Sequence, residues 1–205
     1  ISVSYGQIIK EIKISGNERI PDETILMFSG LDIGENIEKL DINLILKNLY
    51  ETNFFDNVSV DLTNNIISIK VEEAPLIQNI IISGINAKKY EELIKDNVFL
   101  KSKSSFNKFL LLNDVKKIKS QFRTLGFYFT EVETYVEEID NNLVNIEFKI
   151  ALGDKSKISK ISFIGDKIYK NKKLKSIIVS EEYRFWKFIS GKKYLQEQLI
   201  NLDKR

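Results

Sequence analysis

The sequence predicts an α+β protein made of tandem copies of one small module, with the order strand, helix, helix, strand, strand in each copy. Three observations predict this class. A short strand pattern that ends in glycine occurs three times, the copies lie roughly 70 to 80 residues apart, and the first two copies are each followed by two helical stripes and two alternating stretches. A repeat of this length is too long for a solenoid and suits a very small domain.

The repeated strand pattern occupies residues 12–17, 80–86 and 161–166. In each copy, apolar residues stand two apart and a glycine follows two positions after the second of them. This is the pattern of a half-buried strand that ends in a residue able to take positive φ, with Asn or Asp close behind to form a turn. We therefore expect each copy to open a module.

The first module is expected to span residues 1–74. Pro21 and Gly30 bracket a short helix, Asp41 is the expected N-cap of a second helix, and Asn64 and Asn65 form a two-residue turn between two strands. The apolar face of the second helix is formed by Ile42, Ile45, Leu46 and Leu49. The alternating apolar residues are Val58, Val60 and Leu62 in the first of the two strands and Ile67, Ile69 and Val71 in the second.

The second module is expected to span residues 75–153 with longer elements in the same order. Residues 90–96 form a short helix, a longer helix begins near Asn107 and stops at Gly126, and residues 140–142 turn the chain between two strands. The buried face of the longer helix is expected to contain Leu112, Val115, Ile118, Phe122 and Leu125. The alternating residues are Val132, Thr134 and Val136 in the first of the two strands and Val144, Ile146 and Phe148 in the second.

The third module, residues 154–205, is expected to be incomplete. Its first strand is followed by a helix over about residues 169–179, an aromatic linker and a second helix from Tyr194, but no hairpin follows. We therefore expect the sequence to be a fragment of a longer protein.

In the two complete modules, the aromatic residues after the second helix should fill the space between helix and sheet: Phe54, Phe55, Tyr128 and Phe129.

The composition excludes several classes of function. The chain has no cysteine and no histidine, so it has no disulfide, no thiolate metal site and no histidine base or ligand. A Ser-Lys, two-carboxylate or oxygen-ligand site is open in principle, but no spacing selects one. We therefore predict no catalytic residue, no cofactor and no metal, and we predict that the chain is not an enzyme.

The charge is nearly balanced overall but unevenly distributed. The chain carries a formal net charge of +2, while residues 153–205 hold 14 Lys or Arg against 6 Asp or Glu. This basic third module is either a lysine-coated solvated surface or a docking patch for an acidic partner or anionic headgroups.

The order of these features resembles POTRA domains, the polypeptide-transport-associated repeats that precede outer-membrane β-barrels, and more specifically the POTRA region of BamA-type outer-membrane protein assembly factors. The stretches that carry the resemblance are residues 12–20, 49–60, 71–75 and 185–194. The resemblance implies a non-catalytic scaffold on the periplasmic face of the outer membrane. Related TamA-like proteins with three modules, and FtsQ-type division proteins with one, remain open.

The resemblance also implies partners and further parts of the chain. The partners are unfolded outer-membrane β-barrel proteins and accessory assembly lipoproteins, and a membrane barrel of the same chain would lie beyond Arg205. An aromatic cluster on the third module is either a cap on that module's own core or a surface for an accessory protein. Its members are Phe185, Trp186 and Phe188.

Binding is expected at strand edges. The family implies that the last strand of each module is central, so the fourth element is an edge whose backbone groups could pair with an extended client by β-augmentation. The candidate residues are Val58, Ser59, Val60 and Asp61 in the first module and Val132, Glu133, Thr134, Tyr135 and Val136 in the second. The alternative is that Asp61 and Glu133 blunt two solvated edges that bind nothing.

An RNA-binding repeat protein would also have small α+β domains. However, the sequence has no basic-aromatic strand of the RRM kind and no clamp loop of the KH kind, and its first two modules are acidic. We therefore predict no nucleic-acid partner.

Overall fold

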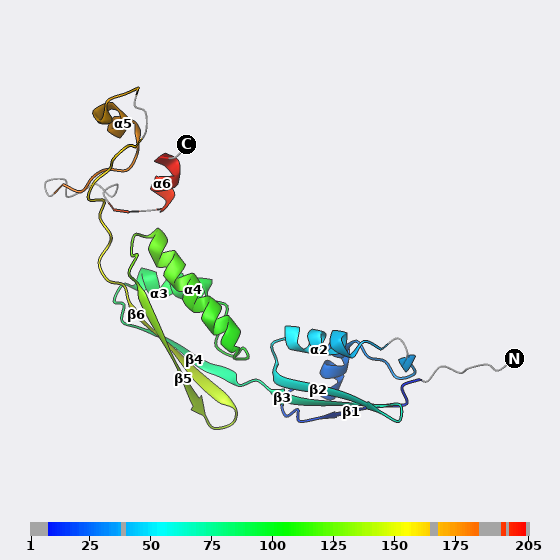
Figure 1. The fold of residues 1–205 in the computed structure, drawn as a ribbon. Helices are drawn as coiled ribbons and strands as arrows, with labels where there is room; N and C mark the ends of the chain where they lie inside the picture. Colours follow the sequence, from blue (N-terminus) through cyan, green and yellow to red (C-terminus); the bar gives the residue numbers. More distant parts are fainter. Residues whose placement is uncertain (1–7, 38–39, 165–167, 185–193, 196, 204–205) are drawn as a thin grey trace. The chain divides into compact units, whose positions relative to one another are not determined.

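The protein contains two full modules with the predicted order of elements (Figure 1). A computed structural model describes residues 8–37, 40–164, 168–184, 194–195 and 197–203. The first module consists of β1 (Glu11–Ser15), α1 (Asp22–Ser29), α2 (Ile42–Glu51), β2 (Phe55–Thr63) and β3 (Ile66–Glu73). The second consists of β4 (Leu76–Ser83), α3 (Lys88–Asn97), α4 (Lys108–Thr124), β5 (Glu131–Ile139) and β6 (Leu143–Ala151). The α+β class and the tandem arrangement are confirmed.

Each module has a three-stranded sheet with its last strand in the centre. The strand orders are β1-β3-β2 and β4-β6-β5. In the first sheet β1 runs parallel to β3, with Ile12 opposite Ile67, whereas β2 runs antiparallel to it. Because the helices lie on one face only (Figure 1), the strands alternate between buried and exposed residues along most of their length.

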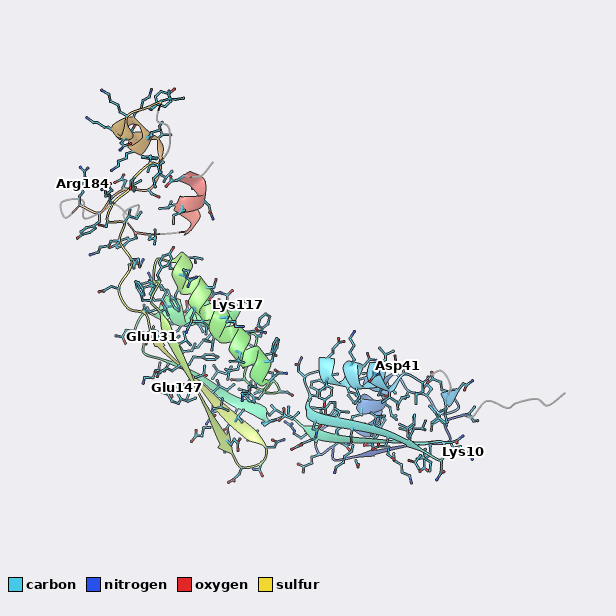
Figure 2. The ribbon with its side chains drawn as sticks, viewed as in Figure 1. Lys10, Asp41, Lys117, Glu131, Glu147 and Arg184 are labelled. Carbon is cyan, nitrogen blue, oxygen red and sulfur yellow. The ribbon has the colours of Figure 1, made fainter. Side chains whose placement is uncertain are left out.

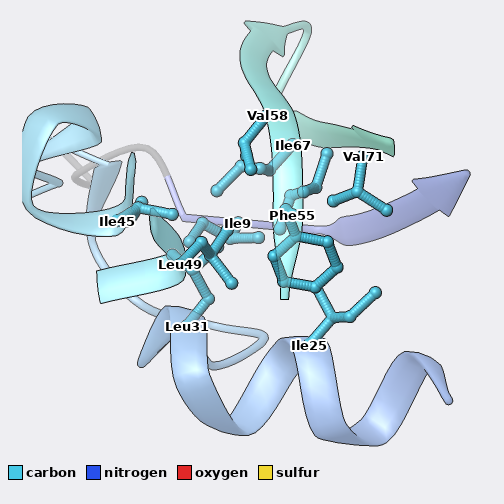
Figure 3. Packing of buried hydrophobic residues seen from close by; sticks show 10 residues of the cluster. Ile9, Ile25, Leu31, Ile45, Leu49, Phe55, Val58, Ile67 and Val71 are labelled. Carbon is cyan, nitrogen blue, oxygen red and sulfur yellow. The ribbon is translucent and has the colours of Figure 1, made fainter. Parts of the chain in front are cut away.

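The core of the first module lies between the two helices and the sheet (Figure 3). Ile25 of α1 and Leu49 of α2 are fully buried and meet the central strand at Ile67 and Ile69, which are also fully buried. Each such side chain stabilises the fold by about 1.5–3 kcal/mol relative to full exposure. The period of four between Ile45 and Leu49 in α2 is therefore what attaches this helix to the sheet.

The local signals in the first module act as the sequence predicts. The Asp41 carboxylate accepts hydrogen bonds from the N–H groups of Asn43 and Leu44 at 3.0 and 3.2 Å, and so caps α2. Asn64 and Asn65 have φ of 53° and 66°, the left-handed pair that a two-residue hairpin turn requires.

The core of the second module is built around aromatic rings. Phe122 of α4 and Phe148 of β6 are fully buried. The Phe122 ring makes edge-to-face contacts with Tyr90 and Phe127 at centroid separations of 5.5 and 6.1 Å. The stripe of α4 that faces this core contains Leu111, Ile118 and Phe122.

Two expectations about the second module are wrong. Leu112, assigned to the buried stripe, is 54% exposed, because it lies about 120° around the helix from Ile118 at 100° per residue. Phe129, expected between helix and sheet, is 78% exposed, and the half-buried Phe127 contacts the core ring of Phe122 instead. Phe55 is buried as expected, and Phe54 is partly buried against the first core.

The segment after the second module contains two short helices, α5 (Asn171–Ile177) and α6 (Glu197–Asp203). The structure assigns no strand to residues 161–164, where the sequence predicts the opening strand of a third module. In the complete modules the opening strand pairs with the last strand, and the described residues of this segment provide no such partner. Among the described residues, none of the helices has the length and apolar character needed to cross a membrane.

The glycine of the repeated pattern allows two backbones to approach closely. Gly16 has φ of 88°, and a Cβ there would lie 2.0 Å from the carbonyl oxygen of Val71 on β3. Gly84 has φ of 81°, and its Cβ would lie 2.2 Å from the carbonyl oxygen of Ile150 on β6. The glycine is therefore required both for positive φ and for contact with the central strand, and the two modules use it in the same way.

A buried carboxylate attaches the β1–α1 loop to the end of β3 in the first module. One oxygen of Glu73 accepts hydrogen bonds from the N–H groups of Glu18, Arg19 and Ile20, each at 2.8 Å. The other oxygen accepts from Nε of Arg19 at 2.7 Å, and Nη2 of Arg19 donates to the Ala74 carbonyl at 2.6 Å.

The Glu73 contact is specific to the first module and perturbs its ionisation. Burial alone would raise the pKa of Glu73, but the N–H donors of Ile20, Glu18 and Arg19 and the Arg19 guanidinium outweigh it and hold the pKa below its ordinary value. Glu73 stands two residues after Val71, whose carbonyl approaches Gly16. In the second module the carbonyl that approaches Gly84 belongs to Ile150, and the residue two positions later is Leu152, so no carboxylate can form this contact there.

Replacing Gly16 by Ala should destabilise the first module by more than about 3 kcal/mol, because the methyl group meets a backbone oxygen as well as an unfavourable φ. Gly34→Ala is the matched control, since Gly34 has φ of 91° with no atom within 4 Å of the added Cβ, and it should cost only about 1 kcal/mol. Urea unfolding of both variants measures the difference. Equal losses would mean that φ, and not the close approach, is what requires Gly16.

Glu73→Gln should destabilise the first module by about 2 kcal/mol at neutral pH, because the charge-assisted bonds to the loop are lost. Since the folded pKa lies below the ordinary value of about 4.3, the Glu73 contribution is complete above that value and is lost as pH falls through the folded pKa. The variant should therefore lose less stability than the unmodified chain as the pH falls from about 5 through the folded pKa of Glu73. Glu35→Gln, at an exposed carboxylate outside this contact, should leave the pH profile of unfolding unchanged.

Candidate functional site

The candidate site consists of the outer edges of the two sheets. Since β3 and β6 are central, β2 and β5 are edge strands, as expected for the fourth element of each module. The structure thus places every predicted edge residue on an edge strand: Val58, Ser59, Val60 and Asp61 on β2, and Val132, Glu133, Thr134, Tyr135 and Val136 on β5.

The opposite edge of each sheet is partly closed by the module's own backbone. In the first module the N–H of Ile9 donates to the Glu35 carbonyl at 2.9 Å, and the N–H of Gly34 donates to the Ile9 carbonyl at 2.9 Å. The N–H of Lys10 turns the other way, to the Asn65 carbonyl of the β2–β3 turn. The loop between α1 and α2 therefore covers the outer edge at the start of the opening strand.

The second module repeats this closure. The N–H of Ile77 on β4 donates to the Ser104 carbonyl at 2.9 Å, and the N–H of Lys103 donates to the Ile77 carbonyl at 2.7 Å. Ile77 stands seven residues before Gly84, as Ile9 stands seven before Gly16. Both opening strands are thus protected at the same position by the loop that precedes the second helix.

The register of β2 identifies its outward-facing backbone groups. Thr63 and Ile66 flank the two-residue turn, so they form a hydrogen-bonded pair, and bonding then alternates along the antiparallel ladder. Asp61 and Ser59 consequently bond to β3, opposite Ser68 and Lys70. The N–H and C=O groups of Val60 and Leu62 point away from β3.

Tyr50 covers the next outward-facing position on β2. Its hydroxyl, at the end of α2, accepts the N–H of Val58 at 3.0 Å and lies 3.4 Å from the side-chain oxygen of Asn57. A register shift between Phe55 and Asn57 brings this part of the strand beneath the helix end. The open part of the edge therefore begins at Val60.

Sequence reasoning did not find Tyr50 or Leu62. Tyr50 stands beside the buried Leu49 in a helix whose pattern indicates only packing, and no sequence feature shows that its hydroxyl reaches a strand eight residues on. The sequence pattern places Leu62 on the strand, but its position at the open edge follows only from the register fixed by the turn.

The faces of β2 differ in chemistry. Val58 is buried and Val60 and Leu62 pack partly against the core on the helix side. Ser59 and Asp61 are exposed on the other side. A chain that paired with this edge would therefore find an apolar side toward the helices and a polar side toward solvent, which suits an extended segment with alternating side chains.

The edge formed by β5 carries a polar cluster on its solvent face. The hydroxyl of Tyr135 donates to the Glu133 carboxylate at 2.9 Å, and Nζ of Lys149 lies 3.5 Å from the same oxygen. The Tyr135 hydrogen bond, followed by the charge of Lys149, lowers the pKa of Glu133, and the Glu133 contact raises the pKa of Tyr135. Tyr135 remains 50% exposed.

The solvent face of the second sheet is acidic around this cluster. Glu131 and Glu137 lie on β5, and Glu147 lies on β6, where its carboxylate accepts the Ser83 hydroxyl at 2.6 Å. Figure 2 shows Glu131 and Glu147 on the strands and Lys117 on α4. An incoming chain at β5 would meet carboxylates, and the β2 edge carries only Asp61 within the predicted stretch.

The structure does not test the predicted aromatic surface of the third module. Phe185, Trp186 and Phe188 lie outside the described residues.

The comparisons with known proteins agree with this architecture. The family model POTRA, described as "Surface antigen variable number repeat", matches residues 7–74 and 75–153. The outer membrane protein assembly factor BamA of Neorickettsia risticii is 25% identical over 203 residues, which are 99% of this chain and 27% of that protein. BamA of Neisseria meningitidis serogroup B is 25% identical over 197 residues, 95% of this chain and 25% of that protein.

Among solved structures, the N-terminal domain of Omp85 from Thermosynechococcus elongatus has a TM-score of 0.48 at 12% identity, covering 97% of this chain and 83% of that chain. The chain spans about a quarter of the length of the BamA relatives and is homologous to their POTRA region. The family model covers both complete modules, and the chain therefore belongs to the POTRA family, whose modules are non-catalytic.

Proposed function

We propose that this chain is the periplasmic receptor and scaffold region of an outer-membrane β-barrel assembly factor. It binds unfolded outer-membrane proteins by adding their strands to β2 and β5, docks accessory lipoproteins, and passes its clients toward a membrane barrel of the same chain. In this proposal residues 1–74, 75–153 and 154–205 are three successive POTRA modules, the third incomplete in this sequence.

The open backbone at Val60 and Leu62 is the observation that carries the proposal. Both edges of the first sheet could in principle accept a strand, but the α1–α2 loop bonds to Ile9, just before β1. On β2 the first outward position is occupied by Tyr50, and the next two are directed to solvent by the register. Recognition through backbone groups reads few side chains, which suits a receptor for clients of many sequences.

The relatives support the larger assignment. The two BamA proteins are named as outer membrane protein assembly factors, and this chain aligns with about a quarter of each. Clients that form transmembrane barrels have strands of about ten residues with alternating apolar and polar side chains. Such strands match the two faces of the β2 edge.

Val60→Pro should abolish strand addition at β2 and leave the module folded. Proline removes the outward-facing N–H of Val60, and an edge strand tolerates proline where that group faces solvent. A ten-residue peptide with alternating apolar side chains, titrated into the 15N-labelled chain, should shift the amides of Leu62 and its neighbours in the unmodified protein. In the variant its affinity should fall by at least about tenfold.

Asp61→Pro is the matched control for fold. The N–H of Asp61 faces β3 in this register, so proline there removes a ladder bond and should lower the melting temperature far more than Val60→Pro does. If the peptide shifts amides elsewhere and spares both β2 and β5, the proposed mode of binding is wrong. If Val60→Pro unfolds the module while Asp61→Pro does not, the register argument is wrong.

Tyr50→Phe should expose the Val58 amide. Removal of one hydroxyl leaves the ring in place and costs about 1 kcal/mol of local protection, so exchange of the Val58 amide with solvent should become about fivefold faster. Because a further outward N–H becomes available, the same peptide should also bind more tightly. Hydrogen exchange followed by NMR measures the first effect, and an unchanged Val58 rate would contradict the capping role of Tyr50.

A further inference from the structure

The solvent face of α4 differs from those of α2 and α3 in its charges. In α2 and α3, lysines stand four residues from glutamates and pair with them: Lys47 with Glu51, Lys88 with Glu92, and Lys95 with Glu91. The exposed face of α4 carries Lys116, Lys119 and Arg123. In the described part of the chain, none of these three cations forms an ion pair.

The acidic residue of α4 does not balance these charges. Asp114 is fully buried, and its carboxylate accepts the N–H of Phe99 at 2.7 Å. Lys119 and Arg123 stand four residues apart, a spacing at which like charges destabilise a helix by a few tenths of a kcal/mol, about 0.2–0.5. The cations on this face of α4 therefore repel one another, and a single exposed glutamate on the helix would reduce this repulsion.

Two exposed apolar side chains continue the same line. Phe109 is 70% exposed and Leu112 is 54% exposed. The spacing from Phe109 through Leu112, Lys116 and Lys119 to Arg123 is three, four, three and four residues, so all five side chains fall on one stripe about 21 Å long at 1.5 Å per residue. The stripe, which we call the α4 stripe, is apolar at its N-terminal end and cationic over the rest.

We propose that the α4 stripe docks an acidic helix of a partner protein, with apolar side chains meeting Phe109 and Leu112 and carboxylates meeting Lys116, Lys119 and Arg123. Side chains spaced three and four apart are the positions that a second helix contacts when it packs lengthwise. The three cations, none of which forms an ion pair in the described part of the chain although Arg123 lies 5.9 Å from the Tyr128 ring centroid, then gain counter-charges, and the exposed apolar pair becomes covered.

An anionic membrane is a poorer match to this stripe. A helix that lies on a bilayer inserts an apolar face along its whole length, with cations beside it. The continuous apolar face of α4 contains Leu111, Ile118 and Phe122, which are buried within the module. At the α4 stripe only the first turn is apolar, which matches a shaped protein surface better than a lipid layer.

This surface lies on a helix and not on a strand edge, so it does not depend on strand addition at β2 or β5. The test uses the 205-residue chain and two synthetic 18-residue helical peptides that carry glutamates on one face and a leucine pair at either the N- or the C-terminal end. Fluorescence anisotropy should show saturable binding of one of them at low salt, weakened as salt screens the charges.

The triple variant Lys116→Glu, Lys119→Glu, Arg123→Glu should weaken this binding by at least about tenfold. The matched control, Lys47→Glu, Lys88→Glu, Lys95→Glu, makes the same change in net charge on α2 and α3 and should alter it less than about twofold. Leu112→Ser should also weaken binding, whereas Leu44→Ser on α2, where Leu44 is 52% exposed, should not.

The proposal is overturned if neither peptide binds, or if the triple variant binds as tightly as the unmodified chain. It is also overturned if vesicles containing phosphatidylglycerol bind through the same cations while both peptides fail, because the ligand would then be a membrane. Sedimentation of the chain alone provides the remaining check: self-association that the triple variant abolishes would identify a second copy as the partner and overturn the choice of a different protein.

Discussion

The close approach of the opening strand to the last strand is the constraint on which each module depends. Gly16 meets the backbone of Val71 and Gly84 meets that of Ile150, so in both modules the first strand can lie directly against the last. This contact, continued by the parallel pairing of β1 with β3, places the last strand in the centre of the sheet. The strand that precedes it in the chain is then left at the edge.

Edge strands differ in how far the rest of the module covers them. The loop before the second helix bonds to the start of the opening strand in both modules, at Ile9 and at Ile77. On β2 the cover is a side chain: the Tyr50 hydroxyl accepts the N–H of Val58 and lies beside the side-chain oxygen of Asn57. In the first module the outer edge is thus bonded to backbone just before β1, whereas the outward N–H and C=O groups of Val60 and Leu62 on β2 point to solvent.

The sequence was informative where a local rule determines the structure. The Asp41 cap, the Asn64-Asn65 turn and the alternation of Val58, Val60 and Leu62 each follow from a few neighbouring residues, and each is present. The choice of the predicted edge strands also agrees with the strand order, although that choice came from resemblance to a family.

The features that the sequence did not reveal depend on contacts between distant residues. Leu112 and Phe129 are apolar residues beside buried ones, and only the rotation of α4 and the packing of Phe127 decide which of them turns outward. Glu73 and Arg19 stand 54 residues apart, so their contact requires the folded sheet. In the same way, residues 161–164 match the opening pattern but have no last strand among the described residues, because a strand pattern becomes a strand only when a partner is present.

The two modules share a backbone plan but differ in the chemistry of their surfaces. In the first module the Glu73 carboxylate binds the β1–α1 loop, and the predicted stretch of the β2 edge has a single carboxylate. The second module has Leu152 in place of Glu73, an acidic sheet face and a cationic helix, α4. A strand edge recognises extended backbone, and a helix face recognises the arrangement of side chains on a folded surface. The second module presents its cations on α4 and its strand edge at β5, so the two proposed modes of binding use different elements. The shared plan thus fixes the positions of the strand edges, while the exposed side chains, which the fold leaves unconstrained, differ between the two modules.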